Sequence, residues 1–355
     1  MPINNMLNQI EPSELIELFA KFPPYDFRVR NNNGVILFET IFNILTTADE
    51  SIAKKLRALE NFPILSGFFK PFATFVGTTL SEYLVLPDID TDLFIDSIFE
   101  GWNTEYLIAK DIPKNSPLLS ARENAYSDRL IDSLEKRGFV TIAGQALAYR
   151  LIDFESIDEY LMKFSQKRRY DFRRKLKKKP DLKLEIEDSG ESFDEPRLAE
   201  YYQMYENVYN KSYVHFDKLT PDFFSGLLRS KTLGAKIFSY YAKTTNELIG
   251  YKICFQGEDM LIDKIAGFKY PQALDMSVYF VSWFDNLQYC LDNKLKKFVI
   301  GWTNPEVKAY LGADFNFTLH CVYPRNPLIR KALKYLARYF ESDKNEFEKF
   351  MNKKS

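Results

Sequence analysis

The order of elements between residues 235 and 301 most constrains the fold. Three apolar strands are predicted over AKIFSYYA, ELIGYKICFQ and DMLIDKIAGF, separated by turn residues at 244–246 and 257–259. Turns this short join antiparallel neighbours, so the strands form a meander. Helical spacing of apolar residues follows in MSVYFVSWFDNLQYCLDN, and KKFVIGW returns as a strand. This order predicts an α+β fold with a mixed, mostly antiparallel sheet flanked by helices.

Part of this order occurs twice. EKRGFVTIAG at residues 135–144 and NKLKKFVIGW at 293–302 each run from a helix through a basic turn into a strand. The chain has 355 residues, and a domain takes roughly 150. We therefore predict two tandem halves, residues 1–146 and residues 147–355.

Composition excludes several classes of protein. The chain has 48 Lys and Arg against 49 Asp and Glu, a near balance that argues against duplex DNA as a partner. Its two histidines and three cysteines form no metal-binding motif, and so few cysteines suit the cytoplasm. No GxG occurs among the 14 glycines, which excludes the common nucleotide loops. No apolar run is long enough to span a membrane, although the apolar stretch 62–86 leaves peripheral membrane contact open.

A strongly basic segment runs from Lys167 to Lys179, with nine Lys or Arg among thirteen residues. It is predicted to lie on a long helix that ends before Pro180. Such clustering is favourable beside an anion, which predicts binding of CoA phosphates, an acyl carrier protein, tRNA or an anionic lipid. The alternative is a solvated helix face. The anion-binding candidates are Lys167, Arg168, Arg169 and Arg173.

Several segments together resemble a known superfamily. They are the basic helix SQKRRYDFRRKLKK, the following YENVY, the strand meander, and the step ending in GWTNPEVKAYLGADF. From Leu147 to Leu333 this pattern resembles the GNAT-fold acyltransferases of the Fem-like branch, which have two tandem GNAT-like halves. The resemblance implies a transferase that moves an acyl group from an activated donor to an amine, with the first half completing the cleft or selecting the acceptor.

The acyl donor stays open at this point. Ordinary GNAT enzymes hold the CoA pyrophosphate on a glycine-rich loop, but here that place reads IAGFKYPQALDMS, with Gly267 alone. We expect an acyl thioester, on CoA or a carrier protein, and an acceptor amine on a small molecule or on a cell-envelope or lipid precursor. The alternatives are an aminoacyl-tRNA-dependent peptide ligase and a non-catalytic module that binds an anionic ligand.

Candidate catalytic residues are those whose side chains can move a proton or carry charge in the cleft. Asp263 and Lys264 interrupt an apolar central strand, and we expect at least one of them in the cleft because unpaired buried charge is costly. An internal salt bridge is the alternative. His215, beside Asp217, is a candidate general base or amine ligand, or else a plain loop residue.

Substrate-binding candidates lie on the next helix and loop. Tyr279 and Trp283 are four residues apart, which predicts a shared aromatic wall for an acyl chain or adenine, with core packing as the alternative. The turn after the last central strand carries polar groups that can order a substrate. These are Trp302, Thr303, Glu306 and Lys308.

Overall fold

The computed structural model describes residues 6–32, 34–42, 70–212 and 216–336. The chain divides into two compact units. The first unit contains the described residues up to Ala148, with 302–310 and those from Phe315 onward, and the second contains 149–301 and 311–314. His215 and residues 62–69 of the apolar stretch lie outside the described residues.

The first unit is an α+β unit whose strands follow the order β2-β3-β4-β6-β13-β7, with β1 and β5 as a separate pair. Its elements are β1 Met6–Leu7, α1 Ser13–Lys21, β2 Arg28–Asn32, β3 Val35–Ile41, β4 Phe72–Val76, β5 Leu86–Pro87, α4 Thr91–Glu100, β6 Tyr106–Ile112, α5 Ala121–Lys136, β7 Val140–Leu151, α12 Pro305–Leu311, β13 Asp314–Pro324 and α13 Pro327–Leu336. The last three residues of β7, the last residue of α12 and the first residue of β13 belong to the second unit.

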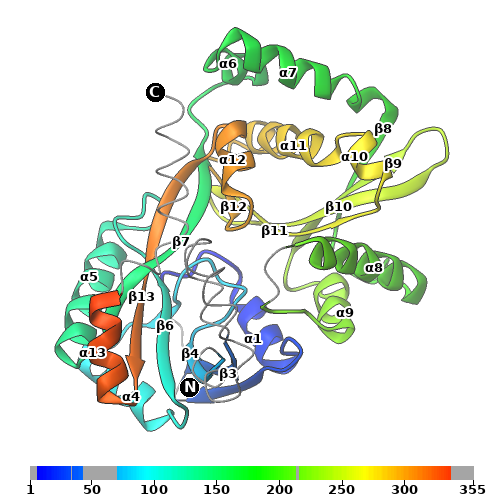
Figure 1. Cartoon of the computed structure of the whole chain (residues 1–355). Coiled ribbons are helices and arrows are strands. Elements are labelled where there is room, and N and C mark those ends of the chain that lie inside the picture. Colours follow the sequence, from blue (N-terminus) through cyan, green and yellow to red (C-terminus); the bar gives the residue numbers. More distant parts are fainter. Residues whose placement is uncertain (1–5, 33, 43–69, 213–215, 337–355) are drawn as a thin grey trace, which may run out of the picture. The chain divides into compact units, whose positions relative to one another are not determined.

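Alternating side chains give the first unit a core on both faces of its sheet. Leu37 points into the cluster that α4 and α5 cover, and Figure 1 shows these helices on one side of β6 and β13. Its neighbour Phe38 points the other way, where it stacks on Phe27 and Phe75 with ring centroids 4.8 Å apart in each case. Phe19 of α1 closes this aromatic group edge-on.

The second unit is built around the predicted meander, in the strand order β12-β11-β10-β9-β8. Its elements are α6 Ile157–Met162, α7 Gln166–Leu176, the 3-10 turn η2 Lys179–Asp181, β8 Leu182–Asp188, α8 Glu195–Lys211, α9 Pro221–Arg229, β9 Ala235–Ala242, β10 Glu247–Gln256, β11 Met260–Phe268, α10 Gln272–Asp275, α11 Val278–Asp292 and β12 Lys297–Gly301. The predicted α+β class, the three strands and the helix that follows them are confirmed.

Helices cover the two faces of this second sheet (Figure 1). On one face the Tyr251 hydroxyl donates to the Tyr201 carbonyl of α8 at 2.8 Å. On the other face Cys254 meets Asn286 of α11. Gly267 lies opposite Tyr251, and a Cβ there would stand 2.2 Å from the Tyr251 ring, so this glycine makes room for an aromatic side chain.

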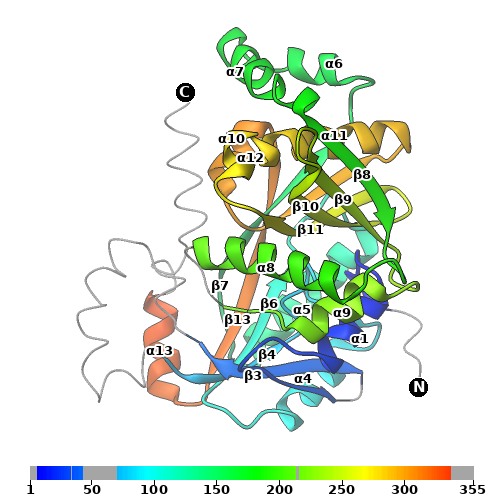
Figure 2. The same ribbon diagram turned by 90° about the vertical axis from the view of Figure 1, so that its right-hand side faces the viewer.

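Two predictions about segments differ from the structure. The single long helix predicted up to Pro180 is two helices, α6 and α7, because the Ser165 side chain accepts from the Arg168 amide and starts a new helix. Figure 2 shows the second of them leading into the edge strand β8. The C-terminal residues from Phe315 group with the first unit, because β13 pairs with β6.

The three cysteines are free thiols and all are buried, Cys254 and Cys290 in the second unit and Cys321 in the first. Burial raises the pKa of Cys290 and of Cys321 to about 12, and that of Cys254 well above its usual range. No described helix is long and apolar enough to cross a membrane.

Candidate active site

The central strands of the second unit separate soon after they pair. β11 and β12 run parallel, but their register covers only Met260 to Ile262 against Lys297 to Val299. β11 continues to Phe268. The pairing of β10 with β11 also shifts at this point, because Ile253 faces Ile265 while Cys254 faces Asp263, which leaves Lys264 as the extra residue of a bulge. The divergence of β11 from β12 and the bulge therefore lie at the same part of the sheet.

Asp263 lies at this divergence and is held in a buried ion pair. Its Oδ2 is 2.7 Å from the Nζ of Lys252 on β10, and both side chains are less than a tenth exposed. Burial disfavours the charged form of Lys252, but Asp263 and Tyr279 outweigh it, so the pKa of Lys252 is raised. The structure therefore shows the salt bridge that the sequence left as the alternative for Asp263.

The predicted aromatic wall is divided between two environments. Lys252 Nζ lies 5.1 Å from the centre of the Tyr279 ring, so Tyr279 belongs to the same group as Asp263. Burial raises the pKa of the Tyr279 hydroxyl. Trp283, one turn further along α11, is buried and packs edge-on against Phe298 of β12. Trp283 thus takes a core position.

Within the GWTNPEVK segment, Gly301 ends β12 in the second unit and residues 302–308 belong to the first unit. Trp302 and Thr303 lie in the turn after β12, as predicted. Glu306 and Lys308 lie on the short helix α12 instead of in the turn. Glu306 is exposed and Lys308 is buried.

The cations of the basic segment form two groups: those that contact other residues of the protein and those that are exposed to solvent. Arg168 stacks over Phe164, 4.3 Å from the ring centre, and Arg169 donates to the Phe164 carbonyl at 2.6 Å. Arg174 and Lys175 both pair with Asp171.

Four cations of the same segment form no ion pair with any described residue. They are exposed, and Tyr170 beside them is 72% exposed. They are Lys167, Arg173, Lys177 and Lys178. With Tyr170 these residues form what we call the α7 basic face.

The backbone amides before α11 are already engaged. Ala273 donates to the Lys269 carbonyl, Leu274 and Asp275 donate to that of Pro271, and the next two amides donate to Gln272 and Leu274. A phosphate cradle needs such amides free. The helix α10 therefore occupies the place where GNAT enzymes carry their glycine loop.

Sequence reasoning missed Lys252 and a second polar group on the same side of the sheet, Tyr240 with Asp285. The signal was present, because Lys252 interrupts the apolar run YKICF and Asp285 interrupts the apolar helix. No group of three or more His, Cys, Asp or Glu that could hold a metal ion is found in the described part of the chain. The expectation of a metal-free site stays a prediction.

Comparison with known proteins places these features in a family. The FemAB-like family model, described as peptidoglycan biosynthesis/recognition, matches residues 104–354. No curated protein matches the chain significantly.

Two solved structures share the fold at low sequence identity. L-PGS from Bacillus licheniformis is 10% identical, with a TM-score of 0.52 over 94% of this chain and 98% of that one. A C-terminal domain assigned to a lysylphosphatidylglycerol synthetase from Agrobacterium fabrum is 10% identical, with a TM-score of 0.54 over 92% and 96%. The GNAT-like fold predicted from the sequence is confirmed.

Proposed function

The chain belongs to the FemAB-like family of peptidoglycan biosynthesis and recognition, and on that premise we propose that it transfers an aminoacyl group from tRNA to an amine of a cell-envelope precursor. The Fem-like membership makes it a transferase, which sets aside the non-catalytic binding module. The choice of donor is our proposal, and it replaces the acyl thioester as the leading candidate.

The α7 basic face is the observation that carries this proposal. Lys167, Tyr170 and Arg173 lie on α7, and Lys177 and Lys178 follow in the turn at its end. All five are exposed, and no described carboxylate forms an ion pair with the four cations. Cations spaced along a helix match a phosphate backbone, and an exposed aromatic ring can stack on an unpaired base. A tRNA offers both groups.

The engaged amides before α11 support the same choice. CoA binding of the usual kind uses free amides in the loop before that helix, and here the five successive amides of residues 273–277 donate to backbone carbonyls. An aminoacyl-tRNA needs no such cradle, because its phosphates are distributed along the backbone and can be held by side chains.

The reaction requires positioning more than covalent chemistry. The acceptor nitrogen attacks the ester carbonyl carbon, a C–N bond forms as the ester C–O bond breaks, and the tRNA hydroxyl leaves with the proton that the amine loses. We place the carbonyl beside the bulge at Lys264, where β11 and β12 diverge, and hydrogen-bond donors at this place would stabilise the oxyanion. Asp263 and Lys264 remain our candidates for proton transfer and charge stabilisation there.

An acyl thioester acting on a small-molecule amine is the second candidate. The divergence of β11 from β12 favours it, because the opening would also accept a narrow, extended thioester arm. This donor would leave the α7 basic face without a role, unless a carrier protein docks there.

The test measures binding of bulk aminoacyl-tRNA by fluorescence anisotropy at several salt concentrations. One variant neutralises the α7 basic face through Lys167→Gln, Arg173→Gln, Lys177→Gln and Lys178→Gln. A matched control removes four exposed cations elsewhere through Lys294→Gln, Lys296→Gln, Lys331→Gln and Lys334→Gln.

In the α7 variant, the slope of log K against log salt concentration should become shallower by about 0.7–0.9 for each lost phosphate contact, or by about 3 in all. Transfer of a labelled amino acid to a precursor amine should fall with it, while the control behaves as wild type. Equal salt slopes in all three proteins, or turnover with acyl-CoA but none with aminoacyl-tRNA, would move the assignment to the thioester donor.

A further inference from the structure

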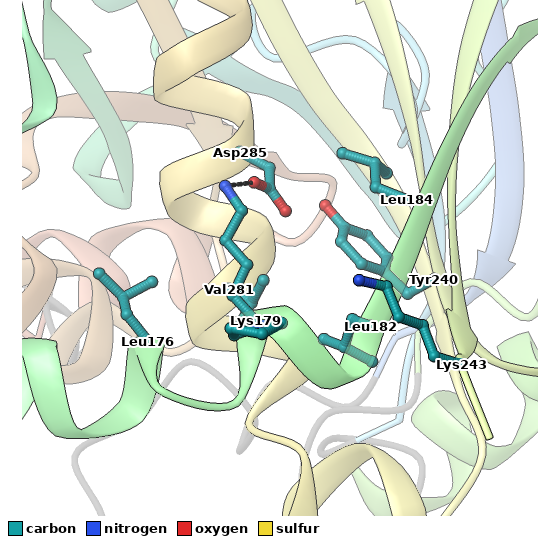
Figure 3. A pocket seen from close by; sticks show the side chains of 9 residues that line it. Leu176, Lys179, Leu182, Leu184, Tyr240, Lys243, Val281 and Asp285 are labelled. Carbon is teal, nitrogen blue, oxygen red and sulfur yellow. Dashed lines mark ion pairs between the residues drawn. The ribbon is translucent and has the colours of Figure 1, made fainter.

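The buried polar groups at the pocket of the second unit satisfy one another. Figure 3 shows Lys179 in an ion pair with Asp285, with the two charged atoms 2.5 Å apart, and the Tyr240 hydroxyl directed toward the same carboxylate. Tyr240 and Asp285 also share a hydrogen bond. These groups stabilise the fold and do not call for a ligand. A free surface of unusual composition lies instead on the first unit, at helix α13.

Helix α13 presents a row of apolar side chains to solvent. Leu328 is 76% exposed and Tyr335 is 71% exposed. They are seven residues apart, which places them two turns apart on one face of the helix, and the exposed Ala332 lies between them. Single exposed apolar side chains are common on soluble proteins, whereas an aligned row indicates an interaction surface. We call these three residues the α13 apolar row.

Contacts on other sides of α13 fix its rotation. Asn326 caps the helix, because its side-chain oxygen accepts from the Leu328 amide at 2.9 Å. The Arg330 side chain donates to the Pro324 carbonyl at 2.9 Å and lies over the Tyr323 ring, 3.6 Å from its centre. The side of the helix that carries Arg330 therefore faces the unit, and the α13 apolar row faces solvent.

Cations without carboxylates accompany this row. The segment from Arg325 to Leu336 contains four Lys or Arg and no Asp or Glu, although the whole chain is nearly neutral. Lys331 borders the apolar row, and Lys334 follows one turn later. Both are exposed and form no ion pair with a described residue. Lysine stems can lie along an apolar layer while their ammonium groups stay in a polar one.

An apolar row bordered by lysines matches the surface of an anionic lipid bilayer. Leu328 would enter the boundary between head groups and acyl chains, where its side chain leaves water. Tyr335 suits the same depth, because its ring is apolar and its hydroxyl can stay among the head groups. The lysines would lie at the level of the lipid phosphates. A nucleic acid has the phosphates but offers no partner for Leu328.

We propose that α13 docks the protein on an anionic membrane, with the helix axis parallel to the bilayer. Seven residues of a helix span about 10 Å, so Leu328 and Tyr335 reach the same depth only in that orientation. Lys331 and Lys334 pair with lipid phosphates. This proposal does not depend on the donor assigned above, and transfer assays without lipid do not involve α13.

The test measures co-sedimentation of the full-length protein with vesicles of phosphatidylcholine alone, or of equal parts phosphatidylcholine and phosphatidylglycerol. We expect saturable binding to the mixed vesicles that weakens as salt is added. Each lysine near an anionic membrane surface strengthens binding about fivefold, so Lys331→Gln with Lys334→Gln should weaken binding to the mixed vesicles about 25-fold. No binding of the wild-type protein to mixed vesicles, or equal binding to both kinds of vesicle, would overturn the proposal.

A second pair of substitutions tests the apolar row. Leu328→Gln with Tyr335→Gln should clearly weaken binding to the mixed vesicles, because two apolar contacts with the bilayer are lost. The matched control is Leu93→Gln with Leu274→Gln, which changes leucines that are 64% and 58% exposed on other helices. The control should bind as wild type. Equal binding by the two double variants would refute an apolar contact through α13.

The α7 basic face is the competing site for anionic lipid. Its four-glutamine variant should retain vesicle binding. Loss of binding in that variant, with unchanged binding in both α13 variants, would move the membrane contact to α7 and overturn the proposal. Hydrogen–deuterium exchange of the wild-type protein needs no variant. Mixed vesicles should slow exchange of the α13 amides and leave those of α7 unchanged, and the reverse pattern would contradict docking through α13.

Discussion

Removing one charge of the Lys252 and Asp263 ion pair should strongly destabilise the second unit. At 2.7 Å and an effective dielectric constant of 20, the two charges attract by about 6 kcal/mol. Their burial costs several kcal/mol per ion, so the pair adds little net stability, but a single charge left behind has no compensation. We expect Asp263→Asn and Lys252→Met each to lower the free energy of unfolding by about 3–5 kcal/mol.

This loss corresponds to a drop in Tm of about 2–4 °C per kcal/mol, or roughly 6–20 °C. The pKa of Lys252 is raised above its usual 10.5, so the lysine is charged in both folded and unfolded chains at neutral pH. Its contribution to stability is therefore complete below 10.5 and is lost only as the pH rises through the folded pKa. Urea unfolding at pH 7.5 measures it in full.

A double-mutant cycle decides whether the two charges act as a pair. The combined Lys252→Met and Asp263→Asn variant leaves no unpaired charge, so its loss should be smaller than the sum of the single losses by about 1–3 kcal/mol. Additive losses, or single losses under about 1 kcal/mol, would refute the buried ion pair. If Asp263 also transfers a proton, its variant should lose turnover under conditions where the protein is still fully folded.

Two further predictions concern single positions. Burial lowers the pKa of His320 below its usual 6.5, so the unfolded chain takes up a proton first and stability should fall as the pH drops below about 6.5. His320→Gln should flatten this part of the curve of Tm against pH, and parallel curves for both proteins would contradict it. Gly267→Ala should cost about 1–3 kcal/mol in urea unfolding, because its Cβ would lie 2.2 Å from the Tyr251 ring. Gly190→Ala, which meets nothing within 4 Å, should stay within about 0.5 kcal/mol of wild type, and equal losses for both would rule out the clash.

Local sequence patterns predicted the elements of the second unit well. The predicted turns at 244–246 and 257–259 separate strands β9, β10 and β11, which coincide with the predicted apolar runs. Helix α11 covers the segment with the predicted helical spacing. The predicted step from helix through basic turn to strand at residues 135–144 also holds, because Gly138 has φ of +90° just past the end of α5. Such features depend on neighbours in the chain.

Features that depend on register or on distant segments were not predictable in the same way. Asp263 is paired with Lys252, which lies eleven residues earlier on the neighbouring strand. A shift of one residue in that register would have turned the two side chains to opposite faces. The bulge at Lys264, the partner of Asp285 and the return of β13 to the first unit all have this non-local origin.

Spacing in the sequence also did not separate the cations of the basic segment by role. Nine similar residues give one strong pattern, yet Arg168 and Arg169 contact Phe164 while Lys167 and Arg173 face solvent. The break at Ser165 sets this division, because it fixes the rotation of α7 independently of α6.

The burial of all three cysteines makes the folded chain nearly inert to thiol reagents, since only the thiolate reacts and each thiol has a raised pKa. A thiol reagent can react with each cysteine only after the unit around it has opened. Cys321 lies in the first unit, and Cys254 and Cys290 lie in the second. The labelling rate of each cysteine therefore reports the opening of its own unit. Mass spectrometry of the labelled peptides can measure both opening rates in one sample, without any engineered probe.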